Sequence, residues 1–114
     1  MGVFAITEEI IYEGELKGIV TSEMAFSSPY NINRVVFSMK IDQEIKDVPK
    51  EIIVIYSSYS IIVIRPGDKV KVDGKIKKKF VKKWNSPKIW FDCHATRFDY
   101  VSHPIQLHRL DIPV

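Results

Sequence analysis

The segment "IRPGDKVKVDGKIKKKF", residues 64–80, carries the strongest fold signal in the chain. It opens with a tight turn, because Pro66 suits the second position of a β-turn and Gly67 can adopt the positive φ that the third position requires. A period of two follows and predicts a half-buried strand with Val70, Val72, Gly74 and Ile76 facing inward. Lys78 also falls on the inward phase, so the strand must leave the core or bulge near that residue.

The rest of the chain repeats this period and shows almost no helical pattern. We expect five strands, at about 12–25, 32–41, 51–56, 69–77 and 88–98. The third is continuously apolar, which is typical of a central strand covered at least in part on both sides. Residues 57–64 form either another strand or a connector that plugs one end of a barrel, and we favour the connector.

The last predicted strand divides its side chains between two faces. Ile89, Phe91, Cys93 and Ala95 alternate inward, whereas Trp90, Asp92 and His94 alternate outward. The single cysteine, Cys93, excludes an internal disulfide framework and is expected to be a small buried hydrophobe.

Length and composition indicate one soluble domain. The 114 residues leave no room for two cores. The most apolar segment, 52–64, is too short to cross a bilayer, so no membrane association is expected. One cysteine favours a reducing, cytoplasmic location. Abundant Ile and Lys with few Asn and Gln favour a thermophilic or AT-rich source.

Charge is distributed unevenly along the chain. The formal net charge is +3, yet residues 65–90 hold ten basic and two acidic residues, a local charge of +8. Much of the acid lies in an early block that comprises Glu8, Glu9, Glu13, Glu15 and Glu23. The basic segment therefore suits an anionic partner.

Two segments resemble the OB-fold nucleic-acid-binding domains. "IRPGDKVKVDGKIKK" is similar to the fourth strand of that family, and "GELKGIVTS" is similar to its first strand, where Gly18 lets the strand bend. The resemblance covers about residues 12–98. It implies an all-β, five-stranded Greek-key OB-fold barrel that occupies the chain as a single domain, with an irregular C-terminal tail at 99–114 and a long basic hairpin between strands four and five.

Lysines and aromatic rings interleave in "KKKFVKKWNSPKIW", residues 77–90, which we expect to project from the barrel. Ammonium groups neutralise phosphates, and aromatic faces stack on unpaired bases. The candidate residues for binding single-stranded DNA or RNA here are Lys77, Lys79, Phe80, Lys82, Lys83, Trp84, Lys88 and Trp90. The resemblance adds Phe26, Tyr30, Arg34 and Lys40 to the same cleft, and alternation alone places Arg34 and Lys40 on one face of their strand.

Other interpretations stay open. Lysine runs are often solvated faces that prevent aggregation, and each aromatic ring is as well suited to packing as to stacking. The apolar residues 52–64 and the C-terminal tail favour an alternative, a protein-interaction OB domain in a nucleic-acid-processing complex. No motif indicates an enzyme or a bound cofactor. Cys93 and His94 are adjacent and fit no paired metal-binding spacing, so no metal site is expected.

Overall fold

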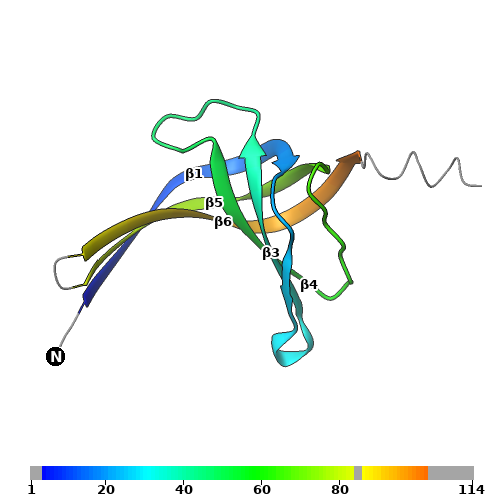
Figure 1. Ribbon diagram of the computed structural model, residues 1–114, viewed down its shortest axis with the longest axis horizontal. Coiled ribbons are helices and arrows are strands. Elements are labelled where there is room, and N and C mark those ends of the chain that lie inside the picture. The colour runs from blue at the N-terminus through cyan, green and yellow to red at the C-terminus, as the bar shows by residue number, and fades with distance from the viewer. Residues whose placement is uncertain (1–3, 84–85, 103–114) are drawn as a thin grey trace, which may run out of the picture.

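The computed structural model describes residues 4–83 and 86–102, and this part of the chain is all-β (Figure 1). It contains no α-helix and one short 3-10 turn. The elements are β1 (Phe4–Val20), β2 (Ala25–Ser27), η1 (Pro29–Asn31), β3 (Asn33–Ile41), β4 (Glu51–Ser58), β5 (Lys69–Lys83) and β6 (Ser86–Ser102).

Five of these strands form a closed ring in the order β1, β3, β4, β6, β5 and back to β1. The β4–β6 contact is parallel and the other four contacts are antiparallel. The five expected strands are therefore confirmed, and β2 is a short addition on the free edge of β3. Closure leaves the strands without free edges where the ring is complete.

The core lies inside the ring and follows the predicted alternation. Val70, Val72 and Ile76 of β5 are buried, and Cys93 of β6 has no exposed surface. Burial raises the pKa of the Cys93 thiol to about 12, as expected for a cysteine that acts as a hydrophobe. The remaining buried apolar side chains are Leu16, Val20, Val35, Phe37, Met39, Ile41, Ile52, Val54 and Ile64.

The predicted turn at Pro66 and Gly67 is confirmed. The Asp68 N–H donates to the Arg65 carbonyl at 3.1 Å, and Gly67 has a φ of 94°. The buried Asp68 carboxylate accepts the Arg65 N–H at 3.0 Å. Backbone bonds between this turn and Val20 then attach the start of β5 to the end of β1.

Gly18 and Gly74 lie where the backbones of neighbouring strands come too close for a side chain. A β-carbon on Gly18 would clash with the carbonyl oxygen of Lys40, and one on Gly74 would lie 2.5 Å from the carbonyl oxygen of His94. Both glycines are thus required by the tight coiling of the ring, as the sequence predicts for Gly18.

The first and fourth strands extend further than expected. β1 begins at Phe4 and ends at Val20, not at residue 25, and its first half pairs with the lysine-rich end of β5. A β-bulge between Ile10 and Tyr12, opposite Ile76 and Lys77, marks the point where the strands leave the ring. Lys78 predicts a break at this point in β5, and the structure shows the break in the partner strand, where Ile11 of β1 is the extra residue.

Beyond the bulge, three strands continue together as what we call the arm: Phe4–Ile10 of β1, Lys77–Lys83 of β5 and Ser86–Asp92 of β6. Figure 1 shows it projecting from the ring at the left. Lys78, Lys79, Lys82 and Lys83, expected beyond the end of the fourth strand, belong to β5 instead. Ile89, expected inside, is 54% exposed because it lies beyond the core, whereas Asp92, expected outside, is only 6% exposed.

Three other expectations concern the middle and the end of the chain. Ser57 and Ser58 still belong to β4, but residues 59–64 form the connector that we favoured over another strand, and its Ile64 is buried in the core. The third strand is buried on one face, by Ile52 and Val54, and covered only in part on the other, where Ile53 is 40% exposed and Ile55 is half-buried. β6 continues to Ser102, so the tail does not begin at residue 99, and residues 103–114 lie outside the described part of the chain.

The close approach at Gly18 makes a stability prediction. Gly18→Ala should lower the free energy of unfolding by about 2 kcal/mol or more, because the added methyl group forces β1 away from β3. Lys17→Ala, at the exposed neighbouring position, is the matched control and should change stability little. Urea denaturation followed by circular dichroism measures both, and equal stabilities would contradict this account of ring closure.

Candidate nucleic-acid interface

Alternation gives the arm two faces of different character. The Trp90 face, as we call it, carries Glu8 of β1, Lys77 and Lys79 of β5, and Trp90 and Asp92 of β6. Cross-strand register places Glu8, Lys79 and Trp90 in one row across the three strands. The opposite face carries Phe80 and its partner Ile89.

Asp92 organises the Trp90 face. Its carboxylate accepts a hydrogen bond from the Trp90 indole Nε1 at 3.2 Å and lies 3.0 Å from the Lys79 ammonium nitrogen. A carboxylate that is almost fully buried needs such partners, because an unpaired buried charge is costly. The hydrogen bond also fixes the Trp90 ring, which stays 37% exposed at the surface of the arm.

Glu8 pairs with both lysines of this face. Its carboxylate lies 3.2 Å from the Lys77 Nζ and 3.9 Å from the Lys79 Nζ. Nearer the ring, Glu15 approaches the Lys71 Nζ to 3.5 Å in the same way. The acidic block of the sequence thus lies along the basic strand, because antiparallel pairing of β1 with β5 sets opposite charges side by side. Lys71, Lys77 and Lys79 of the basic segment gain carboxylate partners in this way.

His94 follows on the same side of β6, opposite Lys75. Its pKa lies below the ordinary value, first because of burial and then because Lys77 and Lys79 repel the imidazolium; Asp92 and Glu8 offset part of this effect. His94 is therefore neutral at physiological pH and adds no charge to the face.

A second group of candidates lies where β2, η1 and the start of β3 meet, a region that we call the foot (Ala25–Arg34). Phe26 is 51% and Tyr30 95% exposed, and Arg34 is exposed on β3. Tyr30 has a φ of 53°, in the left-handed region that a bulky residue rarely adopts. Strained backbone of this kind is often found at functional sites.

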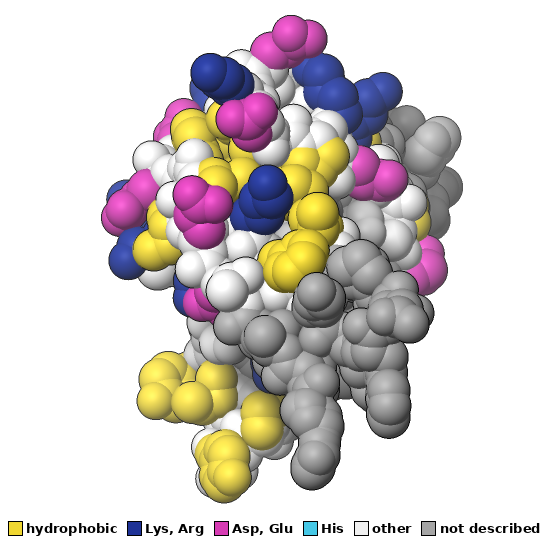
Figure 2. All heavy atoms as spheres, turned by 90° about the vertical axis from the view of Figure 1, so that its left-hand side faces the viewer, with side chains coloured by type: hydrophobic (Ala, Val, Ile, Leu, Met, Phe, Trp, Pro, Cys, Tyr) yellow, Lys and Arg dark blue, Asp and Glu magenta, His cyan; other side chains and the backbone are white. Residues whose placement is uncertain are grey.

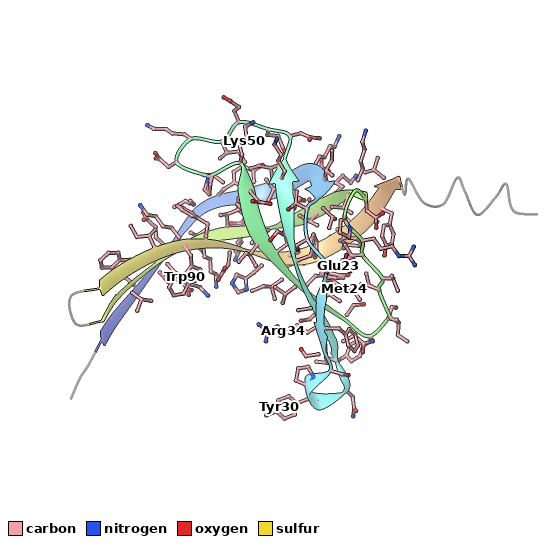
Figure 3. All side chains as sticks on the ribbon, in the orientation of Figure 1. Glu23, Met24, Tyr30, Arg34, Lys50 and Trp90 are labelled. Carbon is pink, nitrogen blue, oxygen red and sulfur yellow. The ribbon has the colours of Figure 1, made fainter. Side chains whose placement is uncertain are left out.

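The arm and the foot project from the ring in different directions and enclose an angle. In Figure 3, Trp90 lies on the side of the arm that faces the foot, and Arg34 extends from β3 into the same angle. The structure therefore brings Trp90, Lys77 and Lys79 to one side of this angle, and Tyr30 and Arg34 to the other. Phe26 pairs with Val35, so it lies on the opposite face of the sheet from Arg34 and does not share this angle.

Two more of the sequence candidates, Lys40 and Phe80, lie elsewhere. Lys40 shares the outward face of β3 with Arg34 but is six residues further along, roughly 20 Å away, opposite Glu51. Phe80 is on the other face of the arm, where it lines a pocket with Thr7, Lys78 and Ile89. The side chains of Lys82, Lys83 and Lys88, and all of Trp84, lie outside the described part of the chain.

Sequence reasoning missed Glu8 and Asp92. Alternation does place Asp92 on the side of Trp90, which is the signal that could have joined the two residues. Glu8 gives no local signal, because its role depends on the register between β1 and β5, whose paired residues lie about seventy positions apart in the chain.

Comparison with known proteins gives no match: no family model, curated protein or solved structure is similar to this chain. Within residues 4–83 and 86–102, no helix has the length and apolarity needed to cross a membrane. In the same part of the chain, no three His, Cys, Asp or Glu side chains gather as a metal site would require.

The environment of His94 predicts a pH-dependent stability. Above its ordinary pKa of 6.5 the residue is neutral both folded and unfolded. As the pH falls below that value, the unfolded chain takes up a proton that the folded state resists, so stability decreases toward the lower folded pKa. His94→Gln should therefore lose less stability than the wild type between about pH 7.5 and pH 5. Thermal unfolding measures this, and equal losses in the two proteins would contradict it.

Proposed function

We propose that this chain binds single-stranded nucleic acid, DNA or RNA, with little sequence preference. The observation that carries the proposal is the exposed indole of Trp90, fixed by Asp92 and flanked by Lys79, on the side of the arm that faces Arg34 and the foot. Aromatic faces stack on any unpaired base, and cationic side chains nearby contact the phosphates between the bases.

The fold supports this proposal. We interpret the five-strand ring as an OB-fold barrel, in which β3 and β4 are the second and third strands and β5 and β6 are the fourth and fifth. The parts of β5 and β6 beyond the ring then form the basic hairpin. Members of that fold class bind oligonucleotides on the second and third strands, between the loops that join strands one to two and four to five. The foot and the tip of the arm correspond to those two loops.

Charge compensation limits how the binding works. Since Lys77 and Lys79 are already paired with carboxylates, stacking on Trp90 and Tyr30 should contribute more than phosphate contacts. Lys82, Lys83, Lys88 and Trp84 remain predicted contacts. The single buried cysteine suits a reducing cytoplasm as the place where the protein acts.

An oligonucleotide titration tests the proposal. Fluorescence anisotropy with labelled oligo(dT) and oligo(U), at about 50 and about 200 mM salt, should show binding that weakens with salt. Trp90→Ala should weaken binding by about tenfold, through loss of one stacked base, and Arg34→Ala should weaken it several-fold.

Two controls match these variants. Ile89→Ala truncates the neighbouring exposed residue on the opposite face of the arm, and Lys46→Ala removes one exposed charge in the loop between β3 and β4; neither should change affinity. If the wild type fails to bind both oligonucleotides at low salt, or if Trp90→Ala and Ile89→Ala bind equally, the proposed function is wrong.

A second candidate function, protein interaction, is favoured by an exposed apolar surface at the foot and the connector. Tyr30, Tyr59 and Ile61 are each at least 80% exposed, and Val63 is 47% exposed. The Asn33 amide donates to the Tyr59 carbonyl at 3.4 Å, which holds the connector beside the foot. Figure 2 shows hydrophobic side chains gathered at this lower end of the molecule. Clusters of this kind commonly mark protein-binding surfaces.

The two functions can be separated by changing this surface. If it binds protein, the wild type should self-associate in sedimentation velocity at high concentration, because the apolar surface is uncovered. The double variant Tyr59→Ser, Ile61→Ser should then stay monomeric and keep its affinity for oligo(dT). A wild type that is fully monomeric at every concentration would leave the protein-interaction candidate without support.

A further inference from the structure

The Glu8 carboxylate forms ion pairs with two lysines of the Trp90 face. One carboxylate oxygen, Oε1, lies 3.2 Å from the Lys77 Nζ, and the other, Oε2, lies 3.9 Å from the Lys79 Nζ. Each oxygen thus faces a different cation. The two non-bridging oxygens of a phosphodiester share one negative charge in the same way, so Glu8 occupies the position that a bound phosphate would need.

The two lysines depend on Glu8 to different degrees. Lys79 has a second carboxylate partner, the buried Asp92 at 3.0 Å, and keeps it when Glu8 is removed. Lys77 has one ion-pair partner among the described residues, and that partner is Glu8. Loss of Glu8 therefore exposes the charge of Lys77 and leaves Lys79 largely compensated.

The Glu8 ion pairs lie at the surface, where a bound phosphate can replace the carboxylate. The Glu8 side chain is 43% exposed, so water screens both of its ion pairs. Backbone pairing with β5 holds the strand on both sides of Glu8, at Thr7 and Glu9, and this pairing does not involve the carboxylate. The side chain can therefore rotate into solvent while the arm keeps its structure.

We propose that Glu8 is an internal competitor of the nucleic-acid backbone: it holds Lys77 and Lys79 in the free protein and is displaced by a phosphodiester on binding. The inference rests on the proposed function. A bound phosphate forms ion pairs with the two lysines, but it must first displace the Glu8 carboxylate. That carboxylate then lies close to the phosphate and carries the same sign of charge. Glu8 accordingly lowers affinity and weakens its salt dependence, since fewer counterions are released per phosphate bound.

The test compares Glu8→Gln with Glu9→Gln in the anisotropy titration with oligo(dT). Both variants remove one negative charge from adjacent positions of β1, but Glu9 lies on the opposite face of the arm, opposite Lys78. Glu8→Gln should bind about fivefold more tightly than the wild type at about 50 mM salt, with a steeper dependence of log K on log salt by about 0.7. Glu9→Gln should differ from the wild type by less than about twofold.

A double-mutant cycle shows whether Glu8 acts through Lys77. In a Lys77→Gln background, the gain from Glu8→Gln should largely disappear, because the released cation is absent. Glu8→Asp keeps the charge but shortens the side chain, so it should give a smaller gain; this variant also serves if Glu8→Gln proves unstable in thermal unfolding.

The outcomes distinguish a failure of this inference from a failure of the proposed function on which it rests. If the wild type binds oligo(dT) and Glu8→Gln binds no more tightly than Glu9→Gln, Glu8 is not a competitor, although the proposed function stands. An equal gain in the presence and absence of Lys77 overturns the inference as well. If no variant binds at any salt concentration, both proposals are wrong.

Discussion

The simultaneous pairing of β1 with β3 and β5 is the constraint on which the structure depends. Gly18 has a partner on each side, Ile41 of β3 and Val70 of β5, and this double contact closes the ring. It is possible only because Gly18 has no side chain to meet the Lys40 carbonyl. Closure in turn encloses the apolar residues of all five strands and removes the sheet edges that would otherwise be exposed.

The same strand determines the character of the arm. Because β1 continues past the bulge at Ile10 and Tyr12, its acidic residues run antiparallel to the lysines of β5. Three lysines of the basic segment, Lys71, Lys77 and Lys79, thereby gain carboxylate partners in the fold. The features that remain distinctive on the Trp90 face are the indole, its buried partner Asp92 and the shared carboxylate of Glu8.

Prediction from sequence succeeded where the evidence was local. The turn at Pro66 and Gly67 depends on four consecutive residues, and the inward face of β5 follows from strict alternation. Prediction failed where a distant strand supplied the decisive contact. Alternation placed Asp92 in solvent, yet Lys79 and Trp90 cover it, and Ile89 was placed in a core that ends before that position.

The sequence by itself determined an all-β chain, its five main strands, the bend at Gly18 and the list of aromatic and basic candidates. Periodicity, turn chemistry and side-chain type are properties of neighbouring residues, so they can be read without a structure. Only the tertiary structure decided that Trp90 and Arg34 lie around one angle, that Lys40 and Phe80 lie away from it, and that Glu8 shares its charge with two lysines. Those relations depend on strand register across the ring, which joins residues far apart in the chain and has no local signature.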